Sequence, residues 1–148
     1  VNDDGSDNLP SYFLDWPCNN KPQGKSGSLA LLSLALEAAE KLAADGIEVR
    51  DCTDEELQLL TDESEKDIIR HLASLTGEIV EAVKKYDPAK ITRYTIELAT
   101  LFHKFYNACR VVCEDESLMQ ARAYLCICVR DTIKNILNLL KIETPESM

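Results

Sequence analysis

Four side chains that suit contact with nucleic acid lie on one side of a predicted helix. They fall within ATLFHKFYNACRVV, residues 99–112, at steps of three or four residues, so they share one helix face. An imidazole or a phenol can stack on an unpaired base, an amide can hydrogen-bond to a base edge, and a guanidinium can pair with a phosphate. We call these four residues the polar stripe: His103, Tyr106, Asn107 and Arg110.

An apolar stripe runs along the same helix. It contains Leu98, Phe102, Phe105 and Cys109 and centres roughly 100° away from the polar stripe on a helical wheel. We assign Phe102 and Phe105 to the core, and we expect the small Ala99 to lie with the polar stripe, where a partner could approach. The polar stripe is then either a surface that binds single-stranded RNA or an ordinary flank of a helical bundle.

One charged residue falls inside an apolar helix face. Arg122 lies between Leu118 and Leu125 on the buried side of the last predicted helix. A charge in this position must find a partner or extend its head group to water. We favour a structural bridge to an acidic or carbonyl group of a neighbouring helix. The alternative is that Arg122 shapes an RNA-binding groove.

Motifs for catalysis or metal binding are missing from the sequence. The six cysteines form no Cys-x-x-Cys pair, the glycines form no phosphate loop, and His71 and His103 lie 32 residues apart. A nucleophilic pair of Cys109 with His103 stays open, although the two fall on different helix faces. We expect no catalytic residue, no metal and no cofactor in this chain. The cysteines then act as small apolar residues in a reducing, cytoplasmic compartment.

Helical periodicity predicts the elements that must position these residues. Residues 1–28 read as an irregular segment, and residues 29–148 as one helical-bundle domain. We predict an all-α fold, an antiparallel bundle of about four to five helices. The principal helices are expected at residues 28–45, 62–86, 88–112 and 117–140, with a short helical stretch within 51–60.

Local signals mark where several of these helices begin or bend. Ser28 can cap the first helix, and Asp62 with Glu65 resembles a capping box for the second. Asp87 followed by Pro88 predicts the start of the third helix. Gly77 lies inside the second helix, where it permits a bend or a close contact.

Charge is distributed unevenly along the chain, whose net charge is −10. Residues 1–83 carry 6 basic and 18 acidic side chains, whereas residues 84–148 carry 10 basic and 8 acidic ones. The second half can therefore face a polyanion despite the acidic average. No run approaches the roughly 20 apolar residues of a membrane span, so no membrane partner is expected. The missing initiator Met indicates an excised or processed piece of a longer chain.

Three separated motifs resemble one family in their order and spacing. LATLFHKFYNACRV (98–111), LMQARAYL (118–125) and LNLLKIETPESM (137–148) resemble the C-terminal DALR-type anticodon-binding domain of arginyl-tRNA synthetases, which are class Ia synthetases. The resemblance covers about residues 62–148. Lys141 stands where that pattern has Gly, and Ser147 where it has Arg. Trp16-Pro17-Cys18-Asn19-Asn20 stands where the family's Tyr-Ala-His-Ala-Arg would be expected.

The resemblance implies a bundle that holds the anticodon loop of a tRNA for arginine. A catalytic domain of the same parent chain would use ATP to charge that tRNA, with no DNA partner. The polar stripe then becomes the favoured RNA-binding site. Met148 is expected to pack beside a base, and Arg122 to serve the architecture.

Two other functions stay open at this point. The acidic average and the missing Tyr-Ala-His-Ala-Arg favour a helical protein-interaction module that has lost tRNA binding. A thiol or metal protein is the third possibility. It would show bound metal after purification.

Overall fold

The computed structural model describes residues 24–141, and it describes side chains from residue 31 onward. This part of the chain contains helices and no strand, which confirms the predicted all-α fold of about four to five helices. The helices are α2 (Gly24–Ala44), α3 (Asp54–Leu57), α4 (Glu63–Lys85), α5 (Ala89–Ala108) and α6 (Glu116–Leu139).

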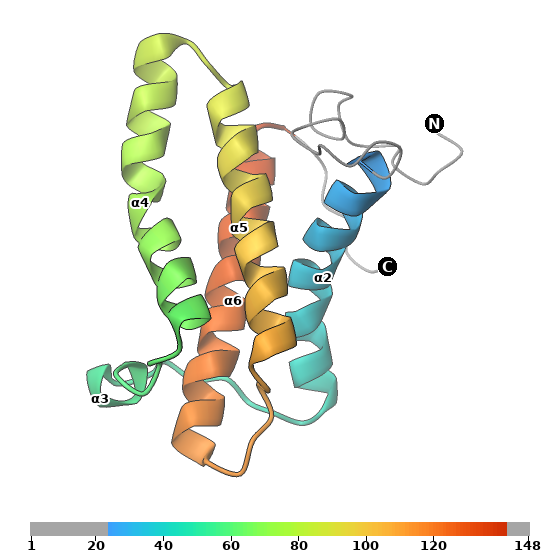
Figure 1. Cartoon of the computed structure of the whole chain (residues 1–148), viewed down its shortest axis with the longest axis vertical. Coiled ribbons are helices and arrows are strands. Elements are labelled where there is room, and N and C mark those ends of the chain that lie inside the picture. The colour runs from blue at the N-terminus through green and yellow to red at the C-terminus, as the bar shows by residue number, and fades with distance from the viewer. Residues whose placement is uncertain (1–23, 142–148) are drawn as a thin grey trace.

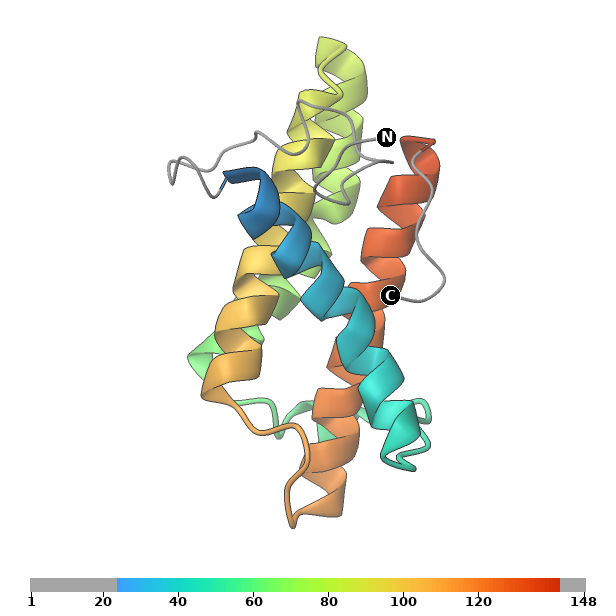
Figure 2. The ribbon, with the colours of Figure 1, turned by 90° about the vertical axis from the view of Figure 1, so that its right-hand side faces the viewer.

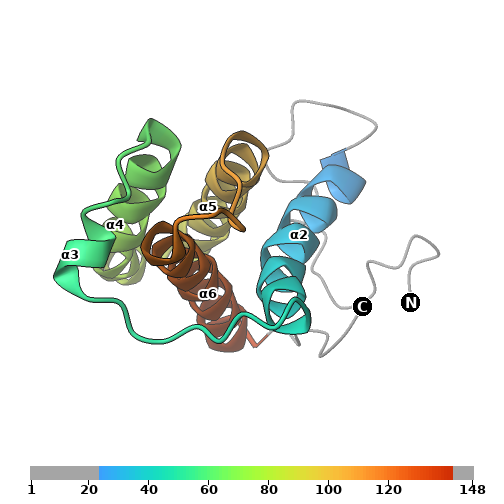
Figure 3. The ribbon, with the colours of Figure 1, turned by 90° about the horizontal axis from the view of Figure 1, so that it is seen from below.

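The four long helices alternate in direction along the chain and form one bundle (Figure 1). Seen end-on, α5 lies between α4 and α2, and α6 lies against α5 and α2 (Figure 3). The side view shows that α2 and α5 run in the same direction, while α6 runs against both (Figure 2). The short α3 contacts α6. Helix α5 is therefore the central element, because it packs against the other three long helices.

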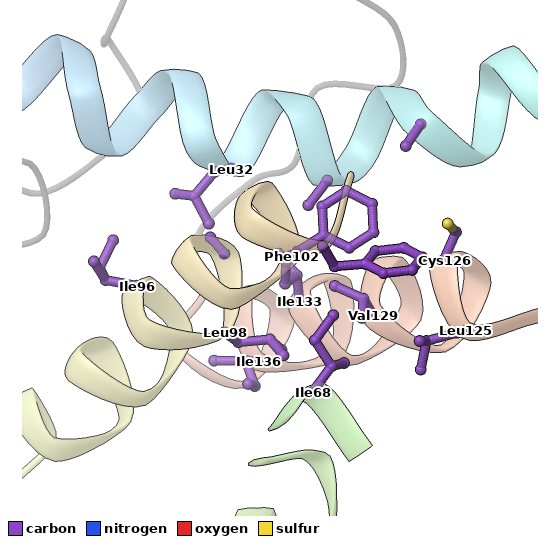
Figure 4. Close-up of a cluster of buried hydrophobic side chains, with 14 of the residues drawn as sticks. Leu32, Ile68, Ile96, Leu98, Phe102, Leu125, Cys126, Val129, Ile133 and Ile136 are labelled. Carbon is purple, nitrogen blue, oxygen red and sulfur yellow. The ribbon is translucent and has the colours of Figure 1, made fainter. Parts of the chain in front are cut away.

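The core fills the space between the four long helices (Figure 4). Phe102 and Phe105 are both fully buried, with their ring centroids 5.9 Å apart. Ile68 from α4 and Val129 from α6 are buried beside them. Large apolar side chains at helical spacing explain why α5 and α6 pack as they do.

Two helices begin differently from the sequence prediction. Helix α2 begins at Gly24, so residues 24–28, which we expected to be irregular, are helical, and Ser28 lies within the helix rather than at its start. Helix α5 has Pro88 at its N-cap position, without a side-chain cap. Asp87 instead pairs with Arg93 at 2.7 Å. The remaining residues of the predicted irregular segment lie outside the described part.

The predicted capping box of α4 is present. The Asp62 carboxylate accepts a hydrogen bond from the backbone of Ser64, and the Glu65 side chain accepts one from the Asp62 backbone at 2.9 Å. Gly77 makes no close contact, because a Cβ at this position would meet nothing within 4 Å. Among residues 24–141, no helix is long and apolar enough to span a membrane.

Helix α5 ends at Ala108, four residues earlier than the periodicity predicts. The chain turns extended at Cys109, with φ −115° and ψ 128°. Cys109 and Val111 are both buried, each 7% exposed, so the segment packs on the bundle instead of continuing the helix. Arg110 consequently lies beyond the helix that was expected to carry it.

Candidate nucleic-acid interface

The C-terminal half of α5 carries three residues of the polar stripe. His103 and Asn107 are exposed, and Tyr106 is half-buried. Arg110 is exposed in the segment that follows the helix. Ala99 is fully buried, so it faces the core and offers no approach to a partner, contrary to the prediction.

The Tyr106 ring is held in place by the core. It stacks on Phe102 with a centroid distance of 5.7 Å and an interplanar angle of 30°. Because Phe102 is fully buried in the core, this contact anchors the tyrosine ring to the core. The ring is half-buried, so part of it stays accessible to a planar partner such as a base.

The Asn107 amide is oriented by a neighbour on the same helix. Its Nδ2 atom lies 3.0 Å from Nε2 of His103, one helical turn earlier. For the amide to donate, the imidazole must be neutral with its proton on Nδ1. The amide oxygen of Asn107 then stays available to an external donor.

Three residues of the polar stripe meet in one pocket of about 330 Å³ between the C-terminal ends of α2 and α5. Tyr106, Asn107 and Arg110 line it, and His103 does not. Helix α2 and its end contribute Lys41, Leu42 and Asp45, and the segment after α5 contributes Cys109, Val111 and Val112. We call this the α2–α5 pocket.

The α2–α5 pocket carries positive charge, although the protein as a whole has a net charge of −10. Lys41 and Arg110 form no ion pair within residues 31–141, so their charges are available to a ligand. Asp45 is the acidic residue of the lining, and it can accept hydrogen bonds from an amine. Two cations without an ion pair among the described residues, an amide and a tyrosine ring suit a ligand that is planar, polar and negatively charged.

Comparison with known proteins identifies the family. The family described as the DALR anticodon binding domain matches residues 32–148. The chain belongs to this family. Its match begins 30 residues before the stretch on which the sequence resemblance rested, so it includes most of α2. Residues 16–20, where the Tyr-Ala-His-Ala-Arg motif was expected, lie before the match and outside the described residues.

The curated relatives of this DALR domain include several arginine–tRNA ligases. The ligase of Caldanaerobacter subterraneus subsp. tengcongensis is 44% identical over 103 residues, which are 70% of this chain and 18% of the relative. The ligase of Ruminiclostridium cellulolyticum is 41% identical over 107 residues, 72% of this chain and 19% of the relative. The chain thus spans about a fifth of the length of these relatives. No solved structure matches the chain significantly.

Arg122 of the DALR domain does not line the α2–α5 pocket, but it contacts the backbone of Arg110, which does. Its Nε atom lies 2.6 Å from Oε1 of the fully buried Glu65, and its Nη1 atom donates to the Arg110 carbonyl at 2.8 Å. Burial disfavours the guanidinium charge, but the hydrogen bond and charge of Glu65 outweigh burial, and the pKa of Arg122 is raised. The structure thus provides the acidic and carbonyl partners that a bridging role requires.

Sequence reasoning missed Lys41 and Asp45. Both lie at the end of an Ala/Leu-rich helix, and nothing in their spacing shows that this end packs beside Tyr106. The early end of α5 was also missed. Met148, the remaining predicted RNA contact, lies outside the described residues.

Proposed function

We propose that this DALR domain binds the anticodon loop of a tRNA for arginine in the cytoplasm. In doing so it positions the tRNA for ATP-dependent aminoacylation by a catalytic domain of the same parent chain. Family membership and the arginine–tRNA ligase relatives support this proposal. The observation that carries it is the α2–α5 pocket, where Tyr106 and Arg110 meet Lys41.

We assign a role in RNA binding to the polar-stripe residues, to Lys41 and to Met148. An unstacked base lies against the accessible part of the Tyr106 ring, and Asn107 bonds to the edge of that base. Arg110 and Lys41 contact a phosphate or a base edge. His103 orients Asn107, and Met148 packs beside a base. Proteins read single-stranded loops in this way, because splayed-out bases expose both their faces and their edges.

The decisive experiment is binding of a labelled tRNA for arginine at low and at moderate salt. The same tRNA with its middle anticodon base changed serves as the comparison. We expect the affinity to fall with rising salt, because phosphate contacts release counterions. We also expect the changed base to weaken binding. An affinity that depends on neither would refute anticodon reading by this domain.

Replacing Tyr106 by Ala tests the stacking role directly. Loss of one base–aromatic stack is worth about 1–3 kcal/mol, so Tyr106→Ala should weaken binding by about fivefold to 150-fold. The matched control is Tyr86→Asn, which removes an exposed tyrosine (93% exposed) at the other end of the bundle. Circular dichroism verifies that both variants stay folded. Equal affinities of the two variants would exclude Tyr106 from the contact.

A second candidate function is a helical protein-interaction module. It is favoured by an apolar pocket of about 460 Å³ at the end of the bundle remote from Tyr106, where Val83, Tyr86 and Leu139 are exposed. Exposed apolar groups gathered in this way often mark protein contacts. A protein partner bound at this pocket would show weak salt dependence, whereas tRNA binding weakens steeply with salt.

A further inference from the structure

The side chain of Arg110 is not positioned by a helix. Helix α5 ends at Ala108, and Cys109 already has extended backbone angles. The direction in which Arg110 points is therefore set by the backbone of the segment between α5 and α6. Anything that fixes this backbone also fixes the position and direction from which the Arg110 side chain enters the α2–α5 pocket.

One side chain from α6 holds that backbone. The Nη1 atom of Arg122 donates to the carbonyl oxygen of Arg110 at 2.8 Å, 12 residues away in sequence. The same guanidinium is anchored by Glu65, whose Oε1 lies 2.6 Å from Nε of Arg122. Glu65 in turn accepts a hydrogen bond from the Asp62 backbone at 2.9 Å, at the first turn of α4.

We propose that Arg122 is a positioning residue of the RNA pocket. Glu65, in the first turn of α4, fixes the Arg122 guanidinium, and the guanidinium holds the Arg110 backbone. This hold keeps the Arg110 side chain directed at the pocket. The role in RNA binding rests on the proposed function, whereas the hold on the backbone does not. Arg122 itself does not touch the ligand, because it does not line the pocket.

An arginine is required for this role. The two bonds leave the guanidinium from different nitrogens and in a fixed relative direction, which a single ammonium group cannot reproduce. Lysine at this position can satisfy the charge of Glu65 but not hold the Arg110 carbonyl at the same time. Arg122→Lys therefore separates charge compensation from backbone positioning.

The first test needs no RNA. Trypsin cleaves after arginine, so the rate of cutting between Arg110 and Val111, measured by mass spectrometry, reports how firmly this segment is held. We expect Arg122→Lys to raise that rate several-fold, while cutting after Lys85 stays unchanged. The matched control is Arg130→Lys on the same helix, where Arg130 bonds to its neighbour Asp131. An unchanged rate at Arg110 in Arg122→Lys would overturn the proposal.

The second test asks whether the hydrogen bond from Arg122 to the Arg110 backbone affects tRNA binding. The affinity for a tRNA for arginine is measured for Arg110→Ala, Arg122→Lys and the double variant. We expect each single change to weaken binding by about tenfold or more, the size of one lost charged hydrogen bond. The double variant should be no weaker than Arg110→Ala alone, because Arg122 acts through Arg110. A merely structural Arg122 would instead give additive losses, which would overturn the proposal.

The two tests separate the inference from the function on which it rests. If Arg110→Ala leaves the tRNA affinity unchanged, the proposed contact of Arg110 with RNA is wrong. The trypsin result still decides whether Arg122 positions the segment.

Discussion

Three residues that line the α2–α5 pocket are restrained by neighbouring groups of the protein. The ring of Tyr106 lies on Phe102, the amide of Asn107 is paired with His103, and the backbone of Arg110 is held by Arg122. Groups fixed in this way lose little conformational freedom when a ligand binds. Lys41 has no such restraint in the described part of the chain, so it is the adaptable contact.

We expect the charge of Lys41 to strengthen the binding of any tRNA, whatever its anticodon sequence. Lys41→Gln should lower the slope of log affinity against log salt concentration by about 1, and it should weaken all tRNA sequences equally. The matched control is Lys104→Gln on α5, which removes the same charge from a side chain that faces Asp67 outside the pocket. Binding as a function of salt checks both variants. A slope that changes equally in both would show that only the overall charge matters.

The positions at which the helices end determine the conformation of the residues that follow them. Helix α5 ends at Ala108, so Arg110 lies in the segment after the helix. The chain after α6 turns at Lys141, whose φ is 59°. This left-handed conformation is strained for residues with a Cβ and favoured by glycine. It gives a physical reason for the glycine that the family pattern has at this position.

Lys141→Gly is expected to stabilise the domain by up to about 1 kcal/mol, because it relieves the left-handed strain after the helix end. The matched control is Lys134→Gly in the interior of α6, where the same substitution should cost about 1 kcal/mol. Chemical denaturation followed by circular dichroism measures both. A loss of stability in Lys141→Gly would contradict the argument.

The elements differ in how far the sequence could predict them. The start of α4 was predictable, because Asp62 and Glu65 form a capping box from residues three apart. The end of α5 was not, because Cys109 and Val111 continue an apolar pattern but are buried in an extended segment. The polar stripe was found from spacing alone, whereas Lys41 required knowledge of how α2 packs on α5.

The whole molecule is acidic, with a net charge of −10, and several of its carboxylates are stabilised by hydrogen bonds in the folded state. A hydrogen bond from Arg50 lowers the pKa of Glu56 to about 2, and hydrogen bonds from Ser64 lower the pKa of Asp62. Hydrogen bonds from Arg70 and from Lys90 lower the pKa values of Glu63 and Glu81. Folding is thus coupled to proton release in acid.

These lowered pKa values predict acid sensitivity. A carboxylate whose pKa is lower in the folded state stabilises the fold above its ordinary pKa, and this contribution is lost as the pH falls through the folded pKa. The unfolding temperature should therefore fall steadily from about pH 4.5 toward pH 2. Arg50→Gln removes the hydrogen bond that lowers the pKa of Glu56, so Glu56 then contributes less to the pH dependence of stability. In this variant the unfolding temperature should fall less steeply at the acidic end of the range. Thermal unfolding at a series of pH values checks both expectations, and a constant unfolding temperature from pH 5 to pH 3 would contradict them.

The ion pair of Glu65 with Arg122 joins residues 57 positions apart, and the side chain of Gln120 bonds to the Glu48 carbonyl across 72 positions. During synthesis α4 and α5 emerge before α6, and as sequence neighbours they can pair first. Until Arg122 leaves the ribosome, however, the Glu65 carboxylate has no cation in its buried place, and burying an unpaired charge is costly. The segment that carries Arg110 can therefore reach its final conformation only after α6 has been synthesised and has packed on the bundle.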